Sequence, residues 1–258
     1  MVLQKEDEKP AAQRSVAPPH RPLLRYYAAP DERFGFVRDL FNRTAGSYDG
    51  INGVLSFGSG AWYRRRSLLR AGLKPGARML DVAVGTGLVA REAVRLLGRA
   101  DDVIGLDVSE GMLGVARSSL RMPFVQARAE ALPLRDAGLD FISMGYALRH
   151  VSDLLLVFGE FRRVLRPGGR LLLLEMGRPE GGLGYTVAKA YLGGIVPALS
   201  RFAGAESRTL MRYYWDTIDA CVPAADILRH LREVGFAEVG CETELGIFRA
   251  YTARRAAD

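Results

Sequence analysis

The strongest constraint on the fold is a regular alternation of apolar runs and helical segments between residues 77 and 176. Five runs have the length and composition of buried strands, and helical segments separate most of them. The strand-like runs are 77–84, 102–108, 123–128, 139–145 and 169–176, and the helical segments are 87–97, 110–121 and 152–166. Strands that alternate with helices form a parallel sheet with helices on both faces. We therefore predict an α/β fold.

The flanking regions complete the predicted organisation. Five prolines and scattered charges in residues 1–30 predict a disordered tail, which leaves one domain over residues 31–258. The other predicted helical segments are 33–46, 60–72, a mostly helical insertion at about 184–220, and 224–234. Two strand-like stretches after the last helix bring the predicted sheet to seven strands.

Composition narrows the class of function. Two cysteines argue against a disulfide framework and for a reducing, cytoplasmic location. With the three histidines they form no metal-ligand spacing, so no metal is expected. The formal charge of +7 favours an anionic partner. The most arginine-dense stretch, Trp62–Arg70 (WYRRRSLLR), is more typical of a helix with a basic face than of a nucleic-acid groove, so no nucleic acid is expected.

The first predicted strand ends at a turn, Gly85-Thr86-Gly87, that leads into a helical segment. Ligands of open parallel sheets lie at the carboxyl ends of the strands, where such a turn lets the backbone approach them. The pattern G-x-G-x-x-A also fits a nicotinamide dinucleotide, whereas a P-loop is excluded because no Gly-Lys-Ser/Thr follows. Asp81 can accept hydrogen bonds from a ligand's amino group or from the turn. Asp107 ends the second strand and can accept both hydroxyls of a ribose.

Several further segments occur in a characteristic order. They are FNRTAGSYDGINGVLSFG, LDVAVGTG, AEALPL, ALRHVSD, VLRPGGRLLLLE and MRYYWDTID. Over residues 36–254 this set resembles the ubiquinone/menaquinone C-methyltransferase family (UbiE/MenG-like) among the class I S-adenosyl-L-methionine methyltransferases. The resemblance implies a Rossmann-like class I methyltransferase fold with a helical cap. It also implies C-methylation of a polyprenylated quinol, with S-adenosyl-L-homocysteine as the cofactor product.

The resemblance implies a set of cofactor residues around the turn and the neighbouring strand ends. Thr86 matches the family's threonine in the turn, and Asp107 matches the acid expected on the ribose. Arg128 and Ala129 occupy the adenine-side pair, but arginine only donates where the family has an acceptor. Gly145 stands where the family has a serine. The residues expected to bind the cofactor are Tyr48, Asp81, Ala83, Gly85, Thr86, Gly87, Asp107, Val108, Met112, Arg128, Ala129 and Gly145.

Methylation of a ring carbon requires an adjacent hydroxyl that is losing its proton, so a base or a cation is needed near the methyl group. Arg149 matches an arginine of the family motif and is the expected cation, with a structural pair to Asp153 as its alternative. His150 is an expected base, or else a helix cap. Asp216 is a second expected base, or else it orients Arg149. The residues expected to contact the acceptor are Asn52, Tyr63, Tyr213, Tyr214 and Trp215.

Other functions remain open at this point. A family member could methylate another small aromatic or natural product at carbon, oxygen or nitrogen. A nicotinamide oxidoreductase fits the turn but lacks a Tyr-x-x-x-Lys pair, and a protein that binds the cofactor without chemistry is a third alternative. The basic surface and the apolar stretch 184–204 predict peripheral contact with an anionic membrane. A homodimer is also among the expected partners.

Overall fold

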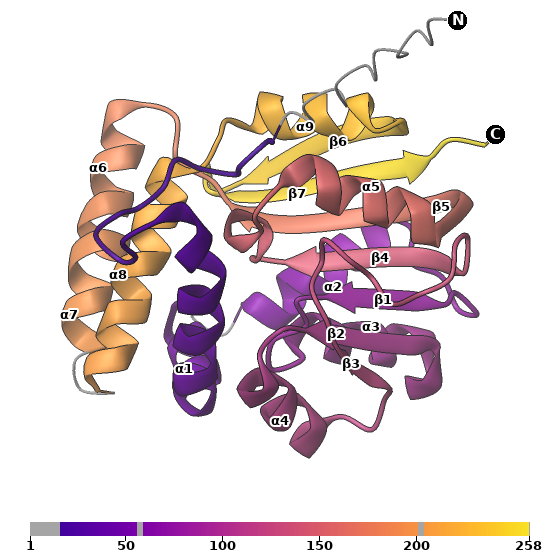
Figure 1. Ribbon diagram of the computed structural model, residues 1–258, viewed down its shortest axis with the longest axis horizontal. Helices are drawn as coiled ribbons and strands as arrows, with labels where there is room; N and C mark the ends of the chain where they lie inside the picture. Colours follow the sequence, from indigo (N-terminus) through magenta and orange to yellow (C-terminus); the bar gives the residue numbers. More distant parts are fainter. Residues whose placement is uncertain (1–15, 56–58, 201–203, 258) are drawn as a thin grey trace, which may run out of the picture.

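The computed structural model describes residues 16–55, 59–200 and 204–257. Its centre is a seven-stranded sheet in the order β3-β2-β1-β4-β5-β7-β6 (Figure 1). The strands are β1 Met79–Val82, β2 Val103–Asp107, β3 Phe124–Gln126, β4 Leu139–Gly145, β5 Leu165–Met176, β6 Phe236–Glu244 and β7 Phe248–Arg255. β7 is antiparallel to both neighbours, and the other strand pairs are parallel. The predicted, mostly parallel seven-stranded α/β fold is confirmed.

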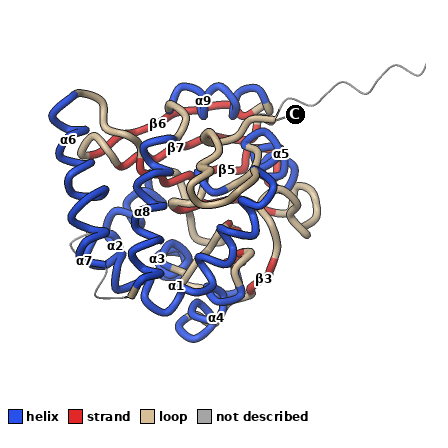
Figure 2. Tube along the Cα trace, turned by 60° about the vertical axis from the view of Figure 1, so that its left-hand side comes forward, coloured by secondary structure: helices blue, strands red, loops and turns tan. Residues whose placement is uncertain are grey.

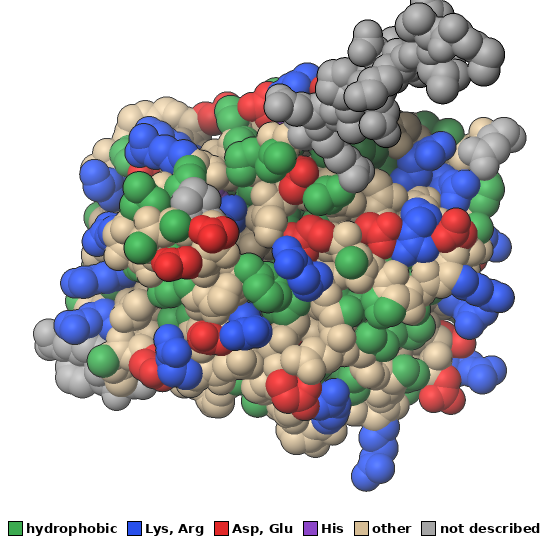
Figure 3. All heavy atoms as spheres, in the orientation of Figure 1, with side chains coloured by type: hydrophobic (Ala, Val, Ile, Leu, Met, Phe, Trp, Pro, Cys, Tyr) green, Lys and Arg blue, Asp and Glu red, His purple; other side chains and the backbone are tan. Residues whose placement is uncertain are grey.

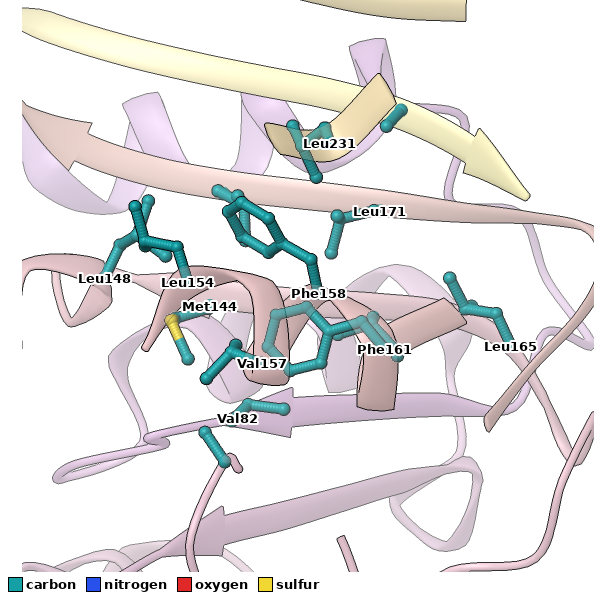
Figure 4. Packing of buried hydrophobic residues seen from close by; sticks show 14 of the residues in the cluster. Val82, Met144, Leu148, Leu154, Val157, Phe158, Phe161, Leu165, Leu171 and Leu231 are labelled. Carbon is teal, nitrogen blue, oxygen red and sulfur yellow. The ribbon is translucent and has the colours of Figure 1, made fainter. Parts of the chain in front are cut away.

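Helices cover both faces of the sheet because successive strand side chains point to opposite sides. Leu171 and Leu173 of β5 pack in one cluster with α5 (Leu154–Val164) and α9 (Ala224–Glu233). Figure 4 shows part of this cluster. Leu172 and Leu174 face the other way, toward α2 (Gly60–Arg70), α3 (Leu88–Leu97) and α4 (Glu110–Ser119). Each such leucine contributes about 1.5–3 kcal/mol when fully buried, which fixes which side of each strand faces which helices.

A helical cap stands at one end of the sheet (Figures 1 and 2). It contains α1 Arg33–Leu55, α6 Gly182–Ala190, the π-helical turn η4 Tyr191–Ile195, α7 Val196–Ser200 and α8 Ala205–Ala220. The 3-10 turns are η1 Pro30–Glu32, η2 Ala100–Asp102 and η3 Leu148–His150. Met176, the last residue of β5, shares the apolar cluster of the cap, so the cap lies at the carboxyl ends of the parallel strands. The helical insertion predicted at about 184–220 is therefore present.

The segment before α1 differs from its prediction. Residues 1–15 lie outside the described part of the chain, but residues 16–29, expected within a disordered tail, pack on the domain. Ala17 accepts a hydrogen bond from the Leu154 amide and donates one to Asp153, and His20 forms a β-bridge with Cys221. These backbone contacts are long-range, and local composition does not predict them. The domain therefore begins before residue 31.

Helix α1 is also longer than expected. The sequence predicted a helix over 33–46, because glycines follow at 46, 50 and 53, each costing about 1 kcal/mol in a helix interior. The structure continues α1 to Leu55. Tertiary contacts hold its second half: Ser47 lies 3.2 Å from the hydroxyl of Ser207, and Asp49 contacts Thr86. Packing on the domain outweighs the low local propensity.

Candidate functional site

The glycine turn follows β1 and opens helix α3. Ala83, Gly85 and Gly87 adopt positive φ angles of 53°, 56° and 89°. Two features require glycine at position 87. Its left-handed backbone conformation disfavours other residues, and a Cβ there would lie 2.5 Å from the side chain of Leu120. No side chain caps the start of α3. Its first amides and the positive end of its dipole therefore face whatever binds at the turn.

Asp107 closes β2 beside the turn, where two backbone amides fix its carboxylate. Its Oδ2 accepts from the Gly85 amide at 2.8 Å, and its Oδ1 accepts from the Ser109 amide at 2.8 Å. Burial raises the pKa of Asp107, and these amides oppose that effect by stabilising the anion. Each oxygen keeps a further lone pair. The carboxylate can therefore accept both hydroxyls of a ribose from a fixed position.

Asp81 is a buried residue of β1, and it does not line the main cleft or the turn cavity. The Ser143 hydroxyl of β4 donates to its carboxylate, which is buried. Burial raises the pKa of Asp81 to about 7, and the hydrogen bond from Ser143 lowers it in part. The Oδ2 atom of Asp81 is buried and has no hydrogen-bond partner among the described residues, so its contacts support neither of the two predicted roles.

Helix α1 is tied to the turn and to the start of α4 by polar contacts. The Thr86 hydroxyl donates to Asp49 at 2.5 Å. Asn42 accepts hydrogen bonds from the Ser109 hydroxyl at 2.7 Å and the Gly111 amide at 3.0 Å. Gly111 permits this approach, because a Cβ there would meet the Asn42 carbonyl oxygen at 2.7 Å. These contacts make α1 one wall of the site.

A cleft of about 790 Å³ lies at the carboxyl ends of β1, β2 and β4, and we call it the main cleft. Its size falls in the range of small-molecule sites. The predicted cofactor residues on its wall are Tyr48, Ala83, Gly85, Asp107, Val108, Met112, Ala129 and Gly145. Phe34, Phe41, Ala127, Glu130 and Tyr146 also line it and were not predicted. The aromatic residues of α1 could have been found only by knowing that α1 folds over the strand ends.

Arg128 is not on the wall of the main cleft. Its guanidinium lies 4.2 Å from the ring centre of Phe34 and contacts Glu130 at 3.5 Å and Ser152 at 3.3 Å. Glu130, which lines the cleft, is the nearby group able to accept a hydrogen bond. Arg128 therefore buttresses Phe34 and Glu130, and its predicted direct contact with adenine is not supported by this position.

His150 reaches the main cleft from η3. Its ring lies 5.5 Å from that of Tyr213 and 5.3 Å from that of Phe41. Neither ring nitrogen has a hydrogen-bond partner among the described residues. Burial, followed by the charges of Arg149 and Arg33, lowers the pKa of His150 well below its ordinary value. The imidazole is therefore neutral at neutral pH, and both of its nitrogens are buried.

Arg149 and Asp216, the other predicted catalytic residues, lie away from the main cleft. Arg149 is 0% exposed and forms an ion pair with Glu175, which is 2% exposed, rather than with Asp153. Its Nε donates to Thr217 at 3.1 Å, and its guanidinium stacks 4.0 Å from the ring centre of Tyr214. The geometry assigns Arg149 a structural role.

Asp216 lies on α8 and faces the N-terminal segment. It accepts hydrogen bonds from the Tyr26 hydroxyl at 2.5 Å and from Arg25 at 2.9 Å. The side chain is thus a tether for residues before α1. Its predicted alternative role of orienting Arg149 has no support in these contacts.

A second hollow of about 700 Å³, the aromatic cavity, lies beside the main cleft. Tyr63 and Tyr214, both predicted acceptor residues, line it together with Ser59, Gly60, Trp62, Arg64, Tyr146, Met176, Leu192, Glu244, Leu245 and Phe248. Tyr213 and Trp215 instead pack inside the cap, near Phe36 and Gly193. Neighbouring side chains of a helix point in different directions. Of the three consecutive aromatic residues predicted to contact the acceptor, only Tyr214 therefore lines the aromatic cavity. The side chain of Asn52 lies outside what the structure describes.

A third and smaller hollow, of about 360 Å³, is the turn cavity. It is lined by Tyr48, Arg64, Ala83, Val84, Gly85, Thr86, Leu88, Val89, Gly145 and Tyr146. Tyr146 borders all three hollows and adopts a positive φ of 60°, which is uncommon for a large residue. The end of β4 is therefore the place where the main cleft, the turn cavity and the aromatic cavity meet.

Comparison with known proteins agrees with this geometry. The ubiE/COQ5 methyltransferase family model matches residues 28–253. The ubiquinone/menaquinone biosynthesis C-methyltransferase UbiE of Hahella chejuensis is 38% identical over 62% of this chain and 66% of that protein. UbiE of a Marinomonas species is 33% identical over 80% of this chain and 84% of that protein.

Solved structures share the fold at lower identity. A SAM-dependent methyltransferase from Aquifex aeolicus has a TM-score of 0.55 and 20% identity over 75% of this chain and 89% of that one. Phosphoethanolamine N-methyltransferase 2 from Haemonchus contortus, solved with S-adenosyl-L-methionine, has a TM-score of 0.55 and 18% identity over 76% of this chain and 53% of that one.

The family match excludes the nicotinamide oxidoreductase interpretation of the turn. The chain belongs to the ubiE/COQ5 methyltransferase family and is an S-adenosyl-L-methionine-dependent methyltransferase.

Proposed function

We propose that the protein methylates a ring carbon of a quinol or related phenol, of the kind that serves as a ubiquinone or menaquinone precursor. The observation that carries this proposal is the aromatic cavity, which adjoins the main cleft and shares Tyr146 with it. Rings and aliphatic side chains line it, as a flat apolar acceptor requires. The names of the UbiE relatives supply the acceptor class.

The residues present fit S-adenosyl-L-methionine. Asp107 offers two fixed carboxylate oxygens to a ribose, and Phe34, Met112 and Ala129 provide apolar wall for a purine. The open turn at Gly85 receives the amino-acid end. When bound, S-adenosyl-L-methionine supplies an electrophilic methyl group, which becomes bonded to the acceptor carbon as the carbon–sulfur bond breaks and S-adenosyl-L-homocysteine is released.

The contribution of the chain is mainly alignment. The two hollows meet at Tyr146, so an acceptor ring in the aromatic cavity can direct one carbon toward the main cleft. Holding two reactants in this way can account for a large part of the barrier reduction in a transfer reaction. The strained backbone of Tyr146 fixes the ring that separates the hollows.

His150 is the base in this proposal. Its neutral imidazole lines the main cleft, and both nitrogens are without a partner among the described residues. It accepts the proton of the acceptor's ring hydroxyl as electron density moves to the attacking carbon, and the hydrogen on the methylated carbon then leaves as a proton, which restores the aromatic ring. The low pKa of His150 keeps it unprotonated over the whole neutral range, so activity should not fall with protonation of this residue above pH 6.

Contact with a lipid surface belongs to the same proposal, because a polyprenyl acceptor resides in a membrane. Helix α6 exposes Leu183 and Val187, one turn apart, at 81% and 60% of their surface. Trp62 and Leu245, at the aromatic cavity, are also exposed. On the face in Figure 3, basic and acidic side chains are interspersed around hydrophobic ones. None of the described helices has the length and apolar composition of a bilayer span.

The test is methyl transfer from labelled S-adenosyl-L-methionine to a panel of demethylated quinols, simple phenols and amines, with product structure read by NMR. We expect a new carbon–methyl bond on a quinol ring. Exclusive O- or N-methylation, or no turnover of any quinol in the presence of lipid vesicles, contradicts the proposal. His150→Phe keeps a ring in the stack but removes the nitrogens, and should lower kcat at least a hundredfold with unchanged S-adenosyl-L-homocysteine affinity. His230→Phe, on α9, is the matched control.

A further inference from the structure

We infer that Arg64 binds the α-carboxylate of S-adenosyl-L-methionine at the glycine turn. This inference deepens the proposed function by assigning the residue that holds the amino-acid end of the cofactor. Arg64 comes from α2, which the sequence predicted as a helix with a basic face. The structure instead turns Arg64 inward.

The three consecutive arginines of α2 have different environments. Arg64 is 8% exposed and lies on the buried face with Ser67 and Leu68. Arg65 is exposed, and Arg66 stacks on Trp62 at 4.9 Å and approaches Glu244 at 3.4 Å. Helical spacing explains the difference, because residues three and four apart share a face. Only Arg64 is placed to act inside the molecule.

Arg64 is a buried cation without a direct ion pair in the described ranges, although its charge acts on the buried carboxylate of Asp81 and lowers the pKa of that group in part. It forms no ion pair there, and its Nε has no hydrogen-bond acceptor in the same part of the chain. Its guanidinium lies 5.7 Å from the ring centre of Tyr146. A buried charge is costly unless it is paired. An anionic ligand would supply the missing partner.

The position of Arg64 identifies that ligand. It lines the aromatic cavity and also the turn cavity, where its neighbours are Gly85, Thr86 and Leu88 of the glycine turn and the start of α3. By contrast, the main cleft has no lysine or arginine among its described lining residues, and its charged groups are Asp107 and Glu130. S-adenosyl-L-methionine carries one carboxylate, at the end that the glycine turn receives. Arg64 is thus the cation at that end, and the first amides of α3 add the positive end of a helix dipole.

A ligand pair that differs only in the carboxylate tests the inference. S-adenosyl-L-homocysteine and its decarboxylated form, S-adenosyl-3-thiopropylamine, are titrated calorimetrically against the wild-type chain, Arg64→Met, Arg64→Lys and Arg65→Met. We expect the wild type and Arg65→Met to bind S-adenosyl-L-homocysteine at least tenfold more tightly than the decarboxylated ligand. Arg64→Met should bind the two ligands equally, and Arg64→Lys should keep part of the preference.

Equal affinity of the wild-type chain for both ligands overturns the inference, whether or not the variants fold. So does an Arg64→Met variant that loses the same factor for both ligands, since that result means collapse of the site. The experiment does not read methyl transfer. Failure of every quinol as an acceptor therefore removes the proposed function and leaves Arg64 assigned, whereas equal binding of the two ligands by the wild type, or a full preference retained by Arg64→Met, removes only the assignment of Arg64.

Discussion

Replacing Arg149 separates a structural role from a catalytic one. Arg149→Met keeps an unbranched apolar side chain but removes the guanidinium that stacks on Tyr214, so Glu175 is left buried without its ion-pair partner. Removing one partner of a buried ion pair costs about 3–5 kcal/mol. For a chain of this size, that loss lowers Tm by roughly 10 °C or more. Glu175→Leu should be destabilising for the same reason, because it leaves the guanidinium unpaired.

The double variant Arg149→Met/Glu175→Leu removes both charges, so most of the lost stability should return. Urea unfolding followed by circular dichroism gives the four free energies of the cycle, and we expect a coupling of about 2 kcal/mol or more. Methyl transfer by the folded double variant should stay within tenfold of the wild type. The structural reasoning is refuted if Arg149→Met loses less than 1 kcal/mol while its turnover falls a thousandfold or more, as expected for a group at the chemistry.

Three further outcomes follow from the structure. Asp107→Asn replaces an acceptor of two backbone amides with a group that also donates, and should raise the Kd for S-adenosyl-L-homocysteine by at least tenfold in calorimetry. Gly111→Ala forces a Cβ against the Asn42 carbonyl oxygen, and should cost about 1–3 kcal/mol in urea unfolding. Burial and Arg33 lower the pKa of His20 to about 4 from 6.5, so the unfolded chain binds the extra proton between these values. Stability should therefore fall as pH drops from 6.5 to 4, and this slope should be smaller in His20→Gln; an unchanged slope contradicts the assignment.

The sequence predicted the parallel sheet, the cap insertion and the glycine turn after the first strand, because each depends on local pattern. Strand residues alternate between two buried faces, and Gly85 and Gly87 provide backbone angles that few other residues adopt. Asp107 was predicted from its place at a strand end, which the parallel arrangement brings to the turn. Such features follow from chain order and the geometry of a single strand or turn.

The positions of individual side chains were predicted less well than the fold. Arg149 was expected near the methyl group, yet it is adjacent in sequence to His150, which does line the cleft. The two residues are neighbours in η3, and their side chains point in different directions. Contacts with Glu175 and Tyr214 hold the side chain of Arg149 away from the cleft. Arg64 was predicted to lie on an exposed basic face because it belongs to a run of three arginines. Its spacing of four residues from Leu68, however, places it on the buried face of α2.

By itself, the sequence determined the fold class, the position of the glycine turn and the family to which the chain belongs, since these depend on short-range pattern and motif order. Only the tertiary structure decided that residues 16–29 pack on the domain, that the hollows converge on Tyr146, and that Arg64 faces the turn without a carboxylate partner in the described chain. These facts depend on contacts between segments far apart in the chain. Their energies exceed local propensities, so local composition could not reveal them.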